Sequence, residues 1–113
     1  MAFGVIPMMK TKAVIEWFTK DQGGRVRPPL GIEIPPYSTV VRFTDEPWPP
    51  TECAWSLIVV KDGQSSTEFR WLAGIRFLMD DAPHDCLRTD RTFELYEGNK
   101  RVARGRIIEN GSN

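Results

Sequence analysis

The stretch Phe93–Ile108 is FELYEGNKRVARGRII, and it holds two β-type runs that meet at Gly98-Asn99. A two-residue loop of this kind suits a tight hairpin, because glycine readily adopts a positive φ and asparagine tolerates one, as the primed turns require. The stretch therefore predicts two antiparallel strands near the end of the chain, joined by a turn at Gly98-Asn99.

Four more segments with the composition of strands precede this hairpin. Thr11–Thr19 is rich in β-branched and aromatic residues, Tyr37–Phe43 alternates, and Ala54–Lys61 is a nearly continuous apolar run of strand length. Thr67–Met79 has the cleanest alternation, and Gly74 within it predicts a bulge or a corner. With the hairpin this makes six strands, and no segment has convincing helical periodicity. The pattern predicts an all-β fold, either a barrel or a sandwich.

The length of 113 residues suits one domain with its own core. We expect a flexible arm over residues 1–10, a single β-barrel domain over residues 11–109 and a short tail over residues 110–113. No run approaches the roughly 18 apolar residues of a membrane span, and the N-terminal segment lacks the basic leader and apolar core of a signal peptide. These features predict a cytoplasmic protein with no membrane partner.

Two segments together resemble the third domain of elongation factor Tu, the C-terminal β-barrel of that GTPase. The first is Asp21–Arg25, with the sequence DQGGR, which is followed at the family's spacing by Pro28 and Gly31. The second is Phe93–Gly105, where a Phe-x-x-x-Glu-Gly turn is followed by Val and a strand of small residues. The resemblance covers roughly residues 11–109. It implies a six-stranded, mostly antiparallel β-barrel.

The resemblance also implies a partner, because the barrel of the elongation factor contacts the T-stem backbone of tRNA. Part of that contact is made by an arginine and a glycine, which match Arg25 and Gly105 here. Val26 and Arg27 stand where the family has a polar pair, and Gly31–Pro35 replaces its Gly-Tyr-Arg-Pro signature. The chain contains no Gly-x-x-x-x-Gly-Lys-Ser/Thr phosphate loop, so we expect no nucleotide and no GTPase activity.

A basic set at the two ends of the domain is the candidate binding site. If Ala103, Gly105 and Ile107 face the barrel interior, then Arg104 and Arg106 point to solvent on one side. The other members of the set are Arg25, Arg27, Lys100 and Arg101. Such a groove would suit phosphate contacts. The alternative is a solvated, charged edge that prevents aggregation between strands, or a protein contact. Zero net charge favours that alternative, since it is not typical of a nucleic-acid-binding protein.

Trp48 is a second candidate, because it lies among Pro47, Pro49 and Pro50. An aromatic side chain held between prolines is a rigid anchor for a partner, and tryptophan is enriched in interface hot spots. The other interpretation, which we favour, is that the loop folds back and Trp48 closes one end of the barrel.

We expect no catalytic residues, no metal and no cofactor. His84 and Cys86 are neighbours in a polar loop, and proximity along the chain does not place a thiol and an imidazole in a defined pocket. A single histidine with two distant cysteines does not make a zinc site, and we expect Cys53 and Cys86 to be free thiols.

The sequence thus favours a non-catalytic β-barrel binding module that docks on an unidentified protein, through the Trp48 loop or the acidic middle of the chain. The alternative is binding of tRNA or another structured RNA through the basic set.

Overall fold

The computed structural model describes residues 11–32, 34–46, 55–63 and 66–110. The strands in this part of the chain are β1 Thr11–Trp17, β2 Tyr37–Phe43, β3 Trp55–Asp62, β4 Arg70–Phe77, β5 Thr92–Glu97 and β6 Lys100–Glu109. Two short 3₁₀ turns, η1 Lys20–Gln22 and η3 His84–Cys86, lie in the connections. No helix among the described residues is long and apolar enough to cross a membrane.

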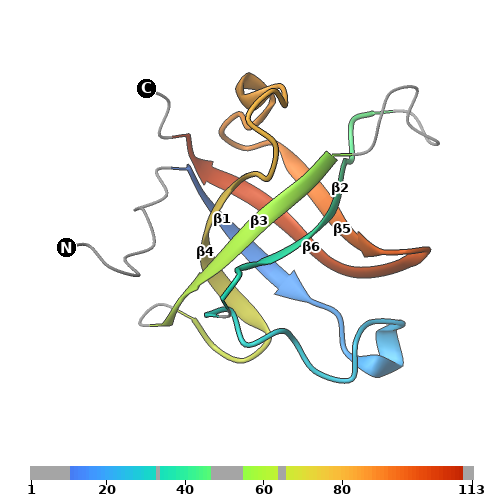
Figure 1. The fold of residues 1–113 in the computed structure, drawn as a ribbon. Coiled ribbons are helices and arrows are strands. Elements are labelled where there is room, and N and C mark those ends of the chain that lie inside the picture. Colours follow the sequence, from blue (N-terminus) through green and yellow to red (C-terminus); the bar gives the residue numbers. More distant parts are fainter. Residues whose placement is uncertain (1–10, 33, 47–54, 64–65, 111–113) are drawn as a thin grey trace.

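The six strands form one closed antiparallel barrel (Figure 1). Their order around the barrel is β1-β4-β3-β2-β5-β6, and β6 closes it by pairing with both β5 and β1. The all-β prediction with six antiparallel strands is therefore confirmed, and of the two architectures the barrel is the one formed. The expected arm over residues 1–10 and the last three residues of the expected tail lie outside the described residues.

The β5–β6 hairpin forms as predicted. Glu97 pairs with Lys100, which leaves Gly98-Asn99 as the two-residue loop. Gly98 has a φ of 62°, whereas Asn99 is not among the described residues with positive φ. A positive φ at the first loop position alone is the feature of a type II′ turn, which matches the twist of the flanking strands.

Two bulges in β6 determine which of its side chains face outward. Leu95 pairs with Ala103 and Tyr96 with Arg101, so Val102 is an extra residue in β6. Because of this bulge Val102 and Ala103 are both buried. From Arg104 on, exposed and buried residues alternate again, so that Arg104 and Arg106 face outward. A second shift lies near the end of β6, opposite Lys12 and Ala13 of β1. No bulge forms at Gly74, because β4 passes Gly74 in regular register with both neighbouring strands.

The interior of the barrel is filled by side chains from all six strands, with Trp71, Phe77 and Phe93 as the largest that are fully buried. Trp55 is only partly buried and packs against this core. Gly105 makes room for the Phe93 ring, because a Cβ on Gly105 would overlap it.

Two predicted strands are shorter in the structure than in the sequence pattern. β1 ends at Trp17 instead of Thr19, because Thr19 is the N-cap of η1 and its N–H donates to Oε1 of Gln22 at 2.9 Å. β4 begins at Arg70 instead of Thr67, because the Thr67 N–H donates to the Arg70 carbonyl at 2.8 Å and so makes a turn.

The barrel has two ends, which are named here for their connections. The hairpin end carries the β5–β6 turn, the β1–β2 connection (residues 18–36) and the β3–β4 connection. The loop end carries the β4–β5 connection (residues 78–91), the β2–β3 connection, the start of β1 and the end of β6. In Figure 1 η3 marks the loop end at the top and η1 marks the hairpin end at the bottom.

We predict that Gly105→Ala destabilises the barrel by about 1–3 kcal/mol, because the added methyl group must displace the buried Phe93 ring. Chemical denaturation monitored by circular dichroism measures this change. Gly63→Ala is the matched control, since a Cβ there meets nothing within 4 Å, and it should change the free energy of unfolding by less than about 0.5 kcal/mol. Equal stability of the two variants would contradict this packing.

Candidate functional site

A shallow groove runs over the outer surface of β1 and its neighbours. It consists of two adjoining hollows of about 460 and 250 Å³ that share the residues Glu16, Arg70 and Arg104. The larger hollow continues over Gly105 and Arg106 of β6. The smaller one reaches the hairpin end. Arg104 and Arg106 of the predicted basic set therefore line one groove, together with Gly105, the other residue that the resemblance singled out.

A row of alternating charges crosses this surface from strand to strand. The residues that pair in register are, in order, Arg70 of β4, Glu16 of β1, Arg104 of β6, Glu94 of β5 and Arg42 of β2. The Arg104 Nε donates to Oε1 of Glu16 at 3.0 Å, and the Arg42 Nη1 lies 3.5 Å from Oε1 of Glu94. Opposite charges that face each other across strands contribute about 0.2–1 kcal/mol per pair. This charge row therefore supports the barrel as well as lining the groove.

Four of the five arginines in the basic set are paired with carboxylates. The pairs are Arg25 with Glu97, Arg101 with Glu94, Arg104 with Glu16 and Arg106 with Asp90. Arg27 and Lys100 are exposed at the hairpin end. The set is thus divided between the hairpin end and the groove, and acidic side chains lie between its members.

Arg25 connects the two segments on which the resemblance to the elongation factor depends. Its Nη1 donates to Oε2 of Glu97, the residue that precedes Gly98, and the Tyr37 hydroxyl donates to the same oxygen. Burial, together with the hydrogen bond to Glu97, raises the pKa of the Tyr37 phenol. Gly24 has no room for a side chain, because a Cβ there would overlap the Phe18 carbonyl. The Gly-Gly-Arg segment is therefore held against the closing hairpin.

An exposed apolar loop follows Arg25 at the hairpin end. Its large side chains are 68–82% exposed, and they are Val26, Leu30, Ile32 and Ile34. Gly31 faces inward, with a φ of 87°, and its carbonyl accepts a hydrogen bond of 3.0 Å from the Lys61 N–H. Sequence analysis missed this surface. The available signal was the spacing of Leu30, Ile32 and Ile34 between two Pro-Pro pairs, in a segment that is not one of the six strands.

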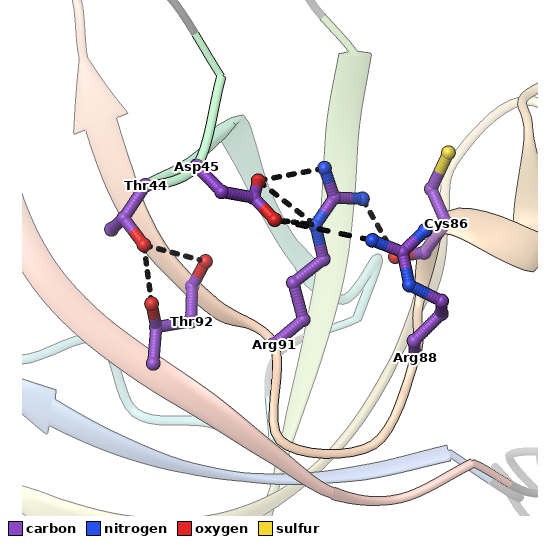
Figure 2. Close-up of polar contacts among 6 residues, drawn as sticks. All are labelled: Thr44, Asp45, Cys86, Arg88, Arg91 and Thr92. Carbon is purple, nitrogen blue, oxygen red and sulfur yellow. Dashed lines mark hydrogen bonds and ion pairs between the residues drawn. The ribbon is translucent and has the colours of Figure 1, made fainter.

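An arginine with a mostly buried side chain, Arg91, connects segments at the loop end (Figure 2). The Arg91 side chain is only 9% exposed, and its guanidinium carbon lies 3.9 Å from the centroid of the Phe43 ring. Its Nη2 donates to Oδ1 of Asp45 at 2.8 Å and its Nη1 to the Cys86 carbonyl at 2.9 Å. The hydrogen bond from Arg91 lowers the pKa of the Asp45 carboxyl. This Arg91 clamp ties the β4–β5 connection to the end of β2.

His84 and Cys86 belong to the same connection, and their contacts are structural. The His84 ring packs edge-on against Phe77 and its Nε2 lies 2.8 Å from the Asp80 carbonyl oxygen. Cys86 is a free thiol that packs against the core. Leu87 of this connection is buried and closes the loop end of the barrel. Trp48, for which a closing role was predicted, lies outside the described residues, as does Cys53.

No protein family, curated protein or solved structure matches this chain. The described residues also contain no cluster of three or more His, Cys, Asp and Glu side chains placed to hold a metal ion. Function must therefore be argued from the two surfaces, the groove and the apolar loop.

We predict that Arg91→Met lowers the free energy of unfolding by about 1–3 kcal/mol, because Asp45 and the Cys86 carbonyl both lose a charged hydrogen-bond donor. Arg88→Met is the matched control. Arg88 is exposed, and its Nη2 lies 3.9 Å from Oδ2 of Asp45. Its replacement should therefore lower the free energy of unfolding by less than about 0.5 kcal/mol. Urea denaturation of both variants measures the difference, and similar losses would mean that the clamp does not depend on Arg91.

Because of the Arg91–Asp45 pair, we also predict that the stability of the protein depends on pH. The pKa of Asp45 is lower in the folded protein than its ordinary value of 3.8, so its charge stabilises the fold above that value. This contribution should be lost as the pH falls through the lowered pKa. We expect the stability difference between the wild type and Asp45→Asn to be constant above about pH 5 and to shrink below about pH 4. A difference that stays the same down to about pH 2 would contradict the pairing.

Proposed function

We propose that this protein is a non-catalytic binding module that docks on another protein through the apolar loop of residues 26–34. The observation that carries the proposal is the exposure of Val26, Leu30, Ile32 and Ile34 on one connection of the barrel. Large apolar side chains scattered singly over a surface are ordinary, but several on one segment are typical of a protein interface.

The anchoring of this loop supports docking. The Arg25–Glu97 pair holds its beginning, and the hydrogen bond from Lys61 to Gly31 holds its middle. Prolines at 28, 29, 35 and 36 restrict the backbone further. Each rotamer-rich side chain that must be ordered on binding costs about 0.5–1.5 kcal/mol, so a loop whose backbone is already held binds at a smaller loss of entropy.

RNA binding through the basic set is the alternative, and the ion pairs weigh against it. A phosphate that approached Arg104 or Arg101 would also approach the carboxylate of Glu16 or Glu94. Affinity for a nucleic acid comes mainly from cations that neutralise phosphates. Relationship to the third domain of elongation factor Tu likewise remains a proposal, supported by the barrel and by the contact between Arg25 and the hairpin.

The docking proposal is tested by replacing two exposed side chains of the loop, in the variant Val26→Ser/Ile32→Ser. Both side chains are exposed in the free protein, so folding should be little affected while capture of a partner is lost. The measurement is affinity capture from lysate with mass spectrometry, in parallel with a photo-crosslinking residue at position 32. We expect at least one protein to be captured by the wild type, cross-linked at position 32 and absent with the variant.

Leu78→Ser is the control, because Leu78 is exposed in the connection at the opposite end of the barrel and should be replaceable without loss of capture. Capture that is equal for the wild type and the loop variant would overturn docking through this loop. Recovery of RNA that nuclease and moderate salt release would instead favour the alternative.

A further inference from the structure

The groove contains an arginine, Arg70, that forms no ion pair within the part of the chain that the structure describes. Arg70 is exposed on the first residue of β4, where the two hollows meet. Within the described part of the chain its guanidinium has no ion-pair partner, although Glu16 is its register neighbour. Glu16 pairs with Arg104 on the other side instead. Arg70 is thus the end of the charge row that is open to a carboxylate from outside.

Aromatic side chains lie next to Arg70 in the smaller hollow. Phe18 and Phe69 line it and are both partly exposed. Phe69 is held in place because its carbonyl accepts a hydrogen bond of 2.8 Å from the Trp17 N–H, and the Phe18 N–H donates to the Val102 carbonyl at 2.9 Å. The hollow therefore offers an apolar wall beside a cation on a well-anchored backbone.

The groove carries charges of both signs, and this favours a peptide over a polyanion as its ligand. Its lining includes Arg70, Arg104 and Arg106, but also the carboxylates of Glu16 and Glu94. A polyanion would meet these carboxylates along its whole length. A peptide can place an acidic side chain at Arg70 and neutral or basic side chains at the acidic positions. A groove of about 460 Å³ with an adjoining hollow is also large enough to hold several side chains.

We propose that this groove binds an extended peptide segment of a partner protein, with a Glu or Asp side chain on Arg70 and an adjacent apolar side chain against Phe18 and Phe69. The peptide carboxylate would pair with the Arg70 guanidinium in the two-pronged geometry that arginine offers. This site is separate from the apolar loop, and it does not depend on the docking function proposed for that loop.

The test begins with selection from a displayed library of random peptides on the intact protein. The expected result is enrichment of peptides with an acidic residue next to an apolar one. Affinity of a selected peptide, measured by fluorescence anisotropy, should fall about tenfold with Arg70→Gln. Arg76→Gln is the matched control, because Arg76 is exposed on the same strand but does not line the groove, and it should leave affinity unchanged.

A charge reversal makes the test independent of any loss of fold. With Arg70→Glu the same library should yield peptides with Lys or Arg in place of the acidic residue, while the circular dichroism spectrum stays that of the wild type. The loop variant Val26→Ser/Ile32→Ser should bind the selected peptide normally, which separates this site from the docking loop. Peptides without an acidic preference, or equal binding by Arg70→Gln, would overturn the proposal. It would equally be overturned if bulk tRNA, and not peptide, bound in a way that Arg70→Gln abolishes.

Discussion

Closure of the barrel by β6 is the constraint on which the rest of the structure depends. β6 pairs with β5 on one side and β1 on the other, so it joins the two ends of the sheet and leaves no open edge among the six described strands. It can do so because Gly105 admits the Phe93 ring to the interior and the bulge at Val102 redirects the side chains that follow. The groove lies over β6 and its neighbours, and the apolar loop is anchored on the end of β5, so both surfaces depend on this closure.

The two ends of the barrel are built differently, and the difference bears on function. At the loop end Leu87 is buried and Arg91 is clamped between Asp45, the Cys86 carbonyl and the Phe43 ring. The polar groups there are used to hold the connection in place. At the hairpin end a connection is anchored by Arg25 and Gly31, yet its apolar side chains point to solvent. Anchored backbone with exposed apolar side chains is the arrangement expected of a binding surface.

Acidic neighbours partly neutralise the basic residues near the end of the chain. Counted along the sequence, Arg101, Arg104 and Arg106 look like a cationic cluster. In the barrel they lie beside Glu94, Glu16 and Asp90, which come from β1 and from the segment around the start of β5. Pairing of this kind lowers the attraction for phosphates, and it leaves Arg70 as the groove cation without an ion pair in the described part of the chain.

Local pattern alone determined the six strands and the turn at Gly98-Asn99, because period-two alternation and turn residues act within a few positions of one another. The outward direction of Arg104 and Arg106 also followed from that alternation. Only the tertiary structure decided which carboxylate each arginine meets, where the bulges fall and which apolar segment stays exposed. Arg25 and Glu97 are 72 positions apart, and the outward exposure of Leu30 and Ile32 follows from an inward contact between Gly31 and Lys61. Such features depend on strand register around a closed barrel, which a one-dimensional pattern does not contain.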